Sequence, residues 1–288
     1  MPRRMVPVQV VDAFTSVPFA GNPAGVVLLP NDDNAPESWM KHVAAEMRHA
    51  ETAFLKPRPH STPSPTSADY DLRWFTPELE VDLCGHATLA AAHTLFSSHP
   101  HLTEVAFHTR SGRLDCRLAP NTAGGRIEMD FPALPLETIV APDGLLQALR
   151  VRPVSVGRSK FDLLVELRTE REVRECKPDL RQLIAIETRG VIIAAAPALQ
   201  PSRGGAGMYD VVSRFFAPRC GVDEDPVTGS AHCVIGPTFA PRLGKSELRC
   251  YQASPRGGIV NLRLSPHTVT LSGDAITTLQ GEILAWKN

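Results

Sequence analysis

The chain lacks most of the patterns that mark specialised classes of protein. In 288 residues its net charge is only −1, so it has no basic surplus with which to neutralise the phosphates of a nucleic acid. It contains no run of about 18 apolar residues, and we therefore expect neither a transmembrane helix nor a membrane partner. Aromatic residues are only 6% of the chain and show no pattern for stacking bases.

The cysteines also exclude several kinds of site. The six are scattered, with no C-x-x-C pair and no His/Cys spacing suited to zinc, so we expect no metal and reduced thiols in a cytoplasmic protein: Cys84, Cys116, Cys176, Cys220, Cys233 and Cys250. The glycine-rich turn at Ser202–Gly207 matches neither a phosphate loop nor a dinucleotide fingerprint. We expect no cofactor.

Short apolar runs joined by turns are abundant. The 26 prolines mostly separate these runs, and alternation predicts strands such as Val6–Ala13 and Tyr70–Phe75. Glycine opens a predicted helix at Gly85–Phe96 and another after Thr228. Strands outnumber helices, so the pattern favours an α+β protein built mainly from β-strands.

An internal repeat relates the two halves of the chain. Arg73–Pro77 is followed by Cys84–Ala87, and Arg214–Pro218 is followed by Thr228–Ala231. Each pair contains Arg, an aromatic residue, Phe, a small residue and Pro, and then x-Gly-x-Ala at the start of a helix. Acidic residues lie between the two motifs in both halves: Glu78, Glu80 and Asp82, then Asp223, Glu224 and Asp225. We expect two similar halves, and structural ion pairs at the repeated arginines.

The repeat predicts a binding site for a small acid. The first N–H groups of a helix have no partner within it and carry partial positive charge, so they bind anions. With both helix starts facing a shared cleft, they would hold a carboxylate together with the Ser230 hydroxyl. The predicted binding residues are Gly85, Ala87, Gly229, Ser230 and Ala231. Ser230 and Asp225 have a simpler alternative role as helix-capping and turn residues.

Glu51 is the candidate base. It begins the predicted strand Glu51–Leu55, where alternation places it on one face with Ala53 and Leu55. Burial raises the pKa of a carboxyl group and suits it to exchange protons near neutral pH. The alternative is an exposed carboxylate at the entrance of a strand.

Four motifs in order give a family resemblance. The chain has FAGNPA, ETAF, RWFTP with LCGHAT, and FFAP with EDPVTGSAH, and a late QASPRGG segment follows. This set resembles the phenazine-biosynthesis isomerase (PhzF-like) family of the diaminopimelate epimerase-like fold, and is similar to the animal phenazine-biosynthesis-like-domain proteins. The resemblance implies two pseudo-symmetric halves, each a mostly antiparallel sheet wrapped round a central helix. We place them at 1–125, joined by a last strand 278–288, and at 126–277.

The resemblance also implies site residues. In relatives, the glutamate of ETAF is the acid/base, which corresponds to Glu51 here. The other matched positions are His86 and Asp225 as catalytic residues, with Asn22 and Ser230 binding substrate. Relatives are often homodimers, and phenazine biosynthesis-like proteins are associated with biosynthesis. The two-thiol racemases of this fold are not matched, because Thr228 stands opposite Cys84 in the repeat.

We therefore expect a cofactor-independent isomerase that moves a proton on a small carboxylic acid. One alternative is a non-catalytic small-acid-binding or protein-interaction protein that keeps the cleft. A weaker alternative is an epimerase using Glu51 and Asp225. Pro237 and Pro241 fall inside the second central helix, where proline removes an N–H donor, so we expect that helix to be short or kinked.

Overall fold

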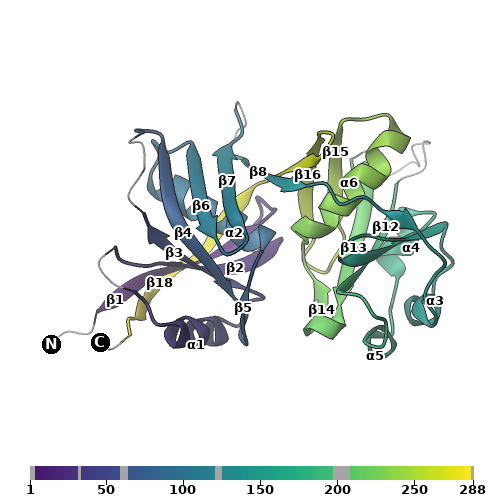
Figure 1. Ribbon diagram of the computed structural model, residues 1–288, viewed down its shortest axis with the longest axis horizontal. Helices are drawn as coiled ribbons and strands as arrows, with labels where there is room; N and C mark the ends of the chain where they lie inside the picture. The colour runs from purple at the N-terminus through teal and green to yellow at the C-terminus, as the bar shows by residue number, and fades with distance from the viewer. Residues whose placement is uncertain (1–3, 32–33, 59–63, 121–124, 197–207, 287–288) are drawn as a thin grey trace. The chain divides into compact units, whose positions relative to one another are not determined.

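The computed structural model describes residues 4–31, 34–58, 64–120, 125–196 and 208–286 (Figure 1). The predicted turn at 202–207 lies outside the described residues. The chain divides into two units, Met1–Asp130 with Ser272–Asn288, and Phe131–Leu271. No helix in the described ranges is both long enough and apolar enough to cross a membrane.

Unit 1 is a mostly antiparallel sheet with a central helix. Its elements are β1 (Met5–Ala13), β2 (Asn22–Leu28), α1 (Glu37–Met47), β3 (Thr52–Pro57), β4 (Ser67–Phe75), β5 (Glu80–Val81), α2 (Gly85–Ser98), β6 (Glu104–Thr109), β7 (Gly112–Leu118), β8 (Ile127–Pro132) and β18 (Ala275–Leu284). Figure 1 shows yellow β18 beside purple β1, with which it pairs in antiparallel fashion.

Unit 2 is also built mostly from strands, with α6 as its central helix. Its elements are β9 (Glu137–Thr138), α3 (Leu145–Leu149), β10 (Ser155–Arg158), β11 (Asp162–Glu166), α4 (Glu170–Glu175), α5 (Leu180–Leu183), β12 (Gly190–Ala195), β13 (Val211–Ala217), the 3₁₀ turn η1 (Pro218–Cys220), β14 (Val222–Asp225), α6 (Gly229–Leu243), β15 (Glu247–Gln252), β16 (Gly258–Leu264) and β17 (Thr268–Gly273). The chain passes between the units within β8 and again within β17.

The two units share their strand pairing. In unit 1, β1-β2-β3-β4-β6-β7 pair in the sequence antiparallel, parallel, antiparallel, parallel, antiparallel. In unit 2, β10-β11-β12-β13-β15-β16 repeat that sequence of directions. A short strand also pairs with the fourth strand of each series, β5 with β4 and β14 with β13. The motif repeat therefore extends to sheet topology.

The central helices are buried on nearly every side. In α2 the buried positions run from His86 to Phe96 with few interruptions, and the helix packs on β1, β2, β3 and β18. α6 packs on β13, β15 and β16. Helices that are apolar all round are found inside a fold rather than on its surface. The predicted α+β class, with each sheet around a central helix, is confirmed.

α6 was expected to be short or kinked, and the expectation that it is short is wrong. It has 15 residues and α2 has 14, although Pro237 and Pro241 both lie inside α6. Pro237 has no N–H to donate to the carbonyl of Cys233. The backbone N–H of Leu134, outside the helix, donates to that carbonyl instead at 3.0 Å. A neighbouring segment thus supplies the hydrogen bond that the proline removes.

The repeated arginines form the expected ion pairs. Nε and Nη2 of Arg73 each donate to Glu80 at 2.7 Å, and those of Arg214 donate to Glu224 at 2.7 and 2.8 Å. Each guanidinium also lies over the ring of the phenylalanine two residues later, at 5.0 and 4.9 Å. These contacts fix the start of the loop that leads to each central helix.

Candidate active site

In unit 1, three side chains meet at the start of α2. Nε2 of His86 lies 3.4 Å from Oε2 of Glu51, and Nδ1 of His86 lies 3.5 Å from Sγ of Cys84. Cys84 and His86 are buried, whereas the Glu51 side chain is 20% exposed. The structure thus brings together two residues predicted from separate motifs, and leaves the carboxylate accessible.

Tight backbone packing sets the position of Glu51. The N–H of Gly25 donates to the carbonyl of Glu51 at 3.3 Å, and Gly25 pairs with Thr52 in the parallel β2–β3 ladder. A Cβ at Gly25 would lie 2.9 Å from Oγ1 of Thr52 and 3.3 Å from Cε of Met47. Only glycine permits this approach without displacement. Glu51 therefore lies just before β3 rather than within it.

The first turn of α2 holds Cys84 and His86. Cys84 precedes the helix in extended conformation, and its carbonyl accepts hydrogen bonds from the N–H and the hydroxyl of Thr88 at 3.1 and 2.6 Å. Within the part of the chain that the structure describes, the Cys84 side chain makes no capping hydrogen bond to α2. The N–H groups of Gly85, His86 and Ala87 belong to the first turn, where the helix supplies no acceptor.

His86 is neutral over the physiological range. Burial lowers its pKa to about 3, and repulsion from His49 adds to the effect. Its Nε2 atom is buried and forms no hydrogen bond with any residue that the structure describes, so the 3.4 Å approach to Glu51 is a contact and not a bond. Buried polar atoms are normally paired, and an unpaired one needs an explanation, of which a catalytic role is one. Nε2 of His232 is also unpaired among the described residues, so the contact with Glu51 is what distinguishes His86.

The same three side chains offer metal-ligand atoms. One atom from each of Glu51, Cys84 and His86 can be chosen so that all lie within 4.8 Å of one another. Carboxylate oxygen, thiolate sulfur and imidazole nitrogen are all zinc ligands. The spacing of His and Cys along the chain does not reveal this cluster, because Glu51 lies far from Cys84 in the chain, just before β3.

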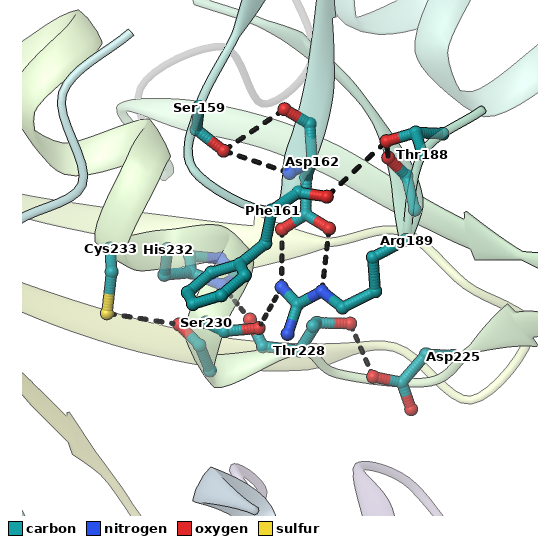
Figure 2. A network of polar contacts seen from close by, with 12 residues as sticks. Ser159, Phe161, Asp162, Thr188, Arg189, Asp225, Thr228, Ser230, His232 and Cys233 are labelled. Carbon is teal, nitrogen blue, oxygen red and sulfur yellow. Dashed lines mark hydrogen bonds and ion pairs between the residues drawn. The ribbon is translucent and has the colours of Figure 1, made fainter. Parts of the chain in front are cut away.

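In unit 2, Asp225 ends β14 and is tied to the start of α6. The hydroxyl of Thr228 donates to Oδ2 of Asp225 at 2.5 Å (Figure 2). Buried Gln252 donates to the carbonyl of Asp225 at 2.8 Å and accepts from the N–H of Thr228 at 2.9 Å. The Asp225 carboxylate is therefore held at a fixed position before the helix.

A capping side chain accepts a hydrogen bond from a backbone N–H of its helix, whereas the Ser230 hydroxyl accepts one from Arg189. Its Oγ accepts a hydrogen bond from Nη2 of Arg189 at 3.0 Å, and α6 has no side-chain cap (Figure 2). The predicted N–H donors of Gly229, Ser230 and Ala231 form the uncapped first turn. The alternative in which Ser230 caps the helix is thus not the geometry observed.

The two central helices begin with matching hydrogen bonds. His86 and Ser230 each occupy the second helical position. Thr88 and His232 each occupy the fourth, and both bond back to the carbonyl of the residue before the helix, at 2.6 and 2.8 Å. Burial lowers the pKa of His232 to about 4.

Asn22 is buried as the first residue of β2, opposite Ala13. Gly21 before it has φ +64°, and a Cβ there would lie 2.2 Å from the carbonyl oxygen of Ala13. The glycine of the GNP motif is thus required by the backbone turn that leads Asn22 into the strand.

Three residues of the unit 2 network carry no function-specific pattern in the sequence. Arg189 and Asp162 are distant in the chain and meet because Asp162 pairs with Gly190 in the parallel β11–β12 ladder. Gln252 begins the QASPRGG segment, which marks its position without indicating that it bridges Asp225 and Thr228. Pairing between strands, and not local spacing, assembles this network.

A cavity described within unit 1 lies elsewhere. A volume of about 490 Å³ in unit 1 is lined by Lys56, Arg58, Arg73 and Arg110, among others, and not by Glu51 or His86. Three of its four cations pair with carboxylates and Lys56 donates to Asn34. Binding sites usually combine a pocket with unpaired polar groups. We therefore describe one candidate region in each unit, the residues around His86 in unit 1 and those around Ser230 in unit 2.

Comparisons with known proteins agree in family. The phenazine biosynthesis-like protein family (PhzC-PhzF) matches residues 11–281. An uncharacterized isomerase of Halalkalibacterium halodurans is 44% identical over 96% of this chain and 98% of its own. The human phenazine biosynthesis-like domain-containing protein is 35% identical over 97% and 99%. The crystal structure of a PhzF-family protein from Enterococcus faecalis superposes with a TM-score of 0.85 at 34% identity, covering 97% of this chain and 99% of that one.

Proposed function

The chain belongs to the phenazine biosynthesis-like protein family, and on that basis we propose that it is a cofactor-independent isomerase that moves a proton on a small carboxylic acid. Relatives named as isomerases support this class of enzyme. The observation that carries the proposal is the approach of the accessible Glu51 carboxylate to the neutral, unbonded Nε2 of His86.

In the proposed reaction Glu51 acts as both base and acid. Its carboxylate takes a proton from one carbon of the substrate, and the electron pair of that C–H bond enters the conjugated system. The proton on the accessible Glu51 carboxyl group exchanges with solvent before Glu51 returns a proton to a second carbon on the same face. A double bond shifts, the substrate loses one proton and regains one, and in heavy water the product carries deuterium. A single positioned carboxyl group serves both steps, as general acid–base catalysis allows.

His86 supports this transfer as a neutral group. A neutral imidazole carries one N–H donor and one acceptor nitrogen. We assign the Cys84 thiol as the donor to Nδ1, which places the ring hydrogen on Nε2, the nitrogen that lies 3.4 Å from Oε2 of Glu51. From there it stabilises the negative charge that develops on the substrate as Glu51 takes the proton, without adding a buried positive charge.

We assign anion binding to the first helical turns. In unit 1 the donors are the N–H groups of Gly85 and Ala87, and we assign buried Asn22 as a further polar binding residue. In unit 2 they are the N–H groups of Gly229 and Ala231 and the hydroxyl of Ser230, while Asp225 binds a polar group of the substrate. Their support is the absence of a side-chain cap at either helix.

Hydrogen exchange in heavy water tests the proposal. The protein is incubated with but-3-enoate, glutaconate, L-alanine and L-proline, and deuterium incorporation and chirality are followed by NMR. We expect incorporation into an unsaturated acid with a shifted double bond. His86→Asn should slow exchange about 10²- to 10⁴-fold. His232→Asn is the matched control, because His232 is a buried, neutral histidine in the other central helix.

The other outcomes separate the alternatives. Binding of an acid without any exchange would indicate a non-catalytic small-acid-binding protein. Exchange with inversion at a chiral carbon would indicate an epimerase. Exchange equally slowed by His86→Asn and His232→Asn would show that His86 has no special role.

A further inference from the structure

The guanidinium of Arg189 contacts Ser230, and the role that we infer for it rests on the proposed function. Arg189 comes just before β12, and its Nη2 donates to Oγ of Ser230 at 3.0 Å (Figure 2). We infer that Arg189 is a positioning residue of the isomerase: it fixes the Ser230 hydroxyl so that this hydroxyl donates to the carboxylate of the substrate.

Arg189 is itself rigidly held. Its Nε and Nη2 donate to the carboxylate oxygens of Asp162 at 2.8 and 2.5 Å, and the Asp162 side chain is completely buried. Its backbone N–H donates to the carbonyl of Phe161 at 3.2 Å, and its guanidinium lies 5.0 Å from the centre of the Phe161 ring. A planar guanidinium held at two nitrogens and over one face loses little further freedom when it binds Ser230.

The direction of the Arg189–Ser230 bond determines what Ser230 can do. A guanidinium only donates hydrogen bonds, so Oγ of Ser230 must be the acceptor. The hydroxyl hydrogen is then directed away from Arg189. Among the residues that the structure describes, no acceptor receives it. The hydroxyl is therefore prepared to donate to a group that the protein does not supply.

The local charge favours an anion at that position. Burial disfavours the charged form of Arg189, but the hydrogen bonds and charge of Asp162 outweigh burial and raise its pKa. Asp162 and Arg189 together are neutral, and the N-terminus of α6 adds partial positive charge next to Ser230. The negative charge of a substrate carboxylate would offset the partial positive charge at the start of α6.

Arg214 serves as a comparison for Arg189, because among the described residues the hydrogen bonds of its guanidinium all go to structural partners. It makes the same two-nitrogen contact with Glu224 and lies over Phe216. Its remaining nitrogen donates at 2.6 Å to the backbone carbonyl of Cys176. Arg214 is therefore bound on all sides by protein, whereas Arg189 extends to a hydroxyl at the start of α6.

The test compares Arg189→Lys with Arg214→Lys and Ser230→Ala. Steady-state exchange in heavy water is measured with the acid of the panel above that the wild type exchanges fastest, and folding is checked by circular dichroism and thermal unfolding. Lysine keeps the charge but cannot bind Asp162 through two nitrogens and Ser230 at once. We expect Arg189→Lys to raise KM about ten- to a hundredfold with a smaller change in kcat, and Arg214→Lys to leave KM unchanged.

A double variant isolates the route through Ser230. If Arg189 acts by holding Ser230, then Arg189→Lys combined with Ser230→Ala raises KM by much less than the product of the single effects. Equal KM values for Arg189→Lys and Arg214→Lys, or fully multiplicative effects, would overturn the inference while the isomerase proposal stands. Absence of exchange by the wild type with every acid would instead contradict the proposed function itself.

Discussion

His86 is held in a state that costs stability in acid. Its imidazole is buried beside Glu51 and Cys84, and it remains uncharged because burial lowers its pKa to about 3. The neutral ring gives the site a hydrogen-bond donor without a second charge next to Glu51. The same feature makes folding sensitive to pH, because the unfolded chain protonates this histidine far more readily.

The pH dependence has a definite sign. Between the ordinary pKa of 6.5 and about 3, the unfolded state binds a proton that the folded state does not. This group therefore costs no stability above about pH 6.5. As the pH falls from there, the free energy of unfolding decreases by about 1.4 kcal/mol for each pH unit. We expect urea midpoints to fall from pH 7 to pH 4, and His86→Asn to flatten this dependence. His101→Asn, at an exposed histidine, is the control and should leave the slope unchanged.

Glu51 and His86 are predictable as residues, but their surroundings are not. The ETAF and CGHAT motifs identify them through the family resemblance. Their mutual distance, the cluster with Cys84 and the unbonded Nε2 arise from the packing of β3 against α2. Arg189 and Asp162 show the limit more clearly, since only the β11–β12 register brings them together.

At the scale of elements, the contact between β2 and β3 fixes the backbone position of Glu51. The N–H of Gly25 binds the Glu51 carbonyl, and Gly25 lies against Thr52 with no room for a side chain. A change in this contact moves the backbone of the proposed base directly. Position of the carboxylate and stability of the strand pair are therefore coupled.

Gly25→Ala tests this coupling. The added methyl group would lie 2.9 Å from Oγ1 of Thr52, so we expect a loss of about 1–3 kcal/mol in the free energy of unfolding, with slower exchange activity. Gly281→Ala is the matched control, because Gly281 lies in β18 and a Cβ there meets nothing within 4 Å. Chemical denaturation of both variants measures the difference. Equal stabilities would show that β2 and β3 adjust freely.

The elements also show where local sequence signals fail. α4 begins with the capping box of Thr169 and Glu172, a pattern that is visible in the sequence itself. Local sequence does not predict the full length of α6, because the Cys233 carbonyl is bound by the N–H of Leu134, which lies on a different segment. Proline rules describe the lost bond and not its replacement.

At the scale of the whole molecule, the two units repeat a topology and a supporting ion pair with different surroundings. Arg73 has a second carboxylate partner in Glu37, and its side chain is 35% exposed. Arg214 has Glu224 as its carboxylate partner among the described residues and is only 12% exposed. The sequence repeat predicts both pairs but not this difference, which depends on α1 lying beside β4 in unit 1.

Removing the charge of each glutamate should therefore have unequal effects. Glu224→Gln leaves a partly buried guanidinium without its counter-charge, and we expect a loss of about 1–3 kcal/mol in the free energy of unfolding. Glu80→Gln should cost less, because Glu37 still pairs with Arg73 and water reaches it more easily. Urea denaturation of the two variants is the measurement. A larger loss for Glu80→Gln would contradict the stated roles of exposure and of Glu37.

The central claim is that one carboxylate in unit 1 transfers the proton. Its most direct test is Glu51→Gln in heavy water with an acid that the wild type exchanges, alongside Glu46→Gln, an exposed glutamate on α1, as control. The amide keeps the size of the side chain but has no basic oxygen to take a proton. We predict that Glu51→Gln remains folded and loses deuterium incorporation by at least about 10²-fold, while Glu46→Gln exchanges at the wild-type rate. A folded Glu51→Gln protein that exchanges as fast as the wild type would contradict the account.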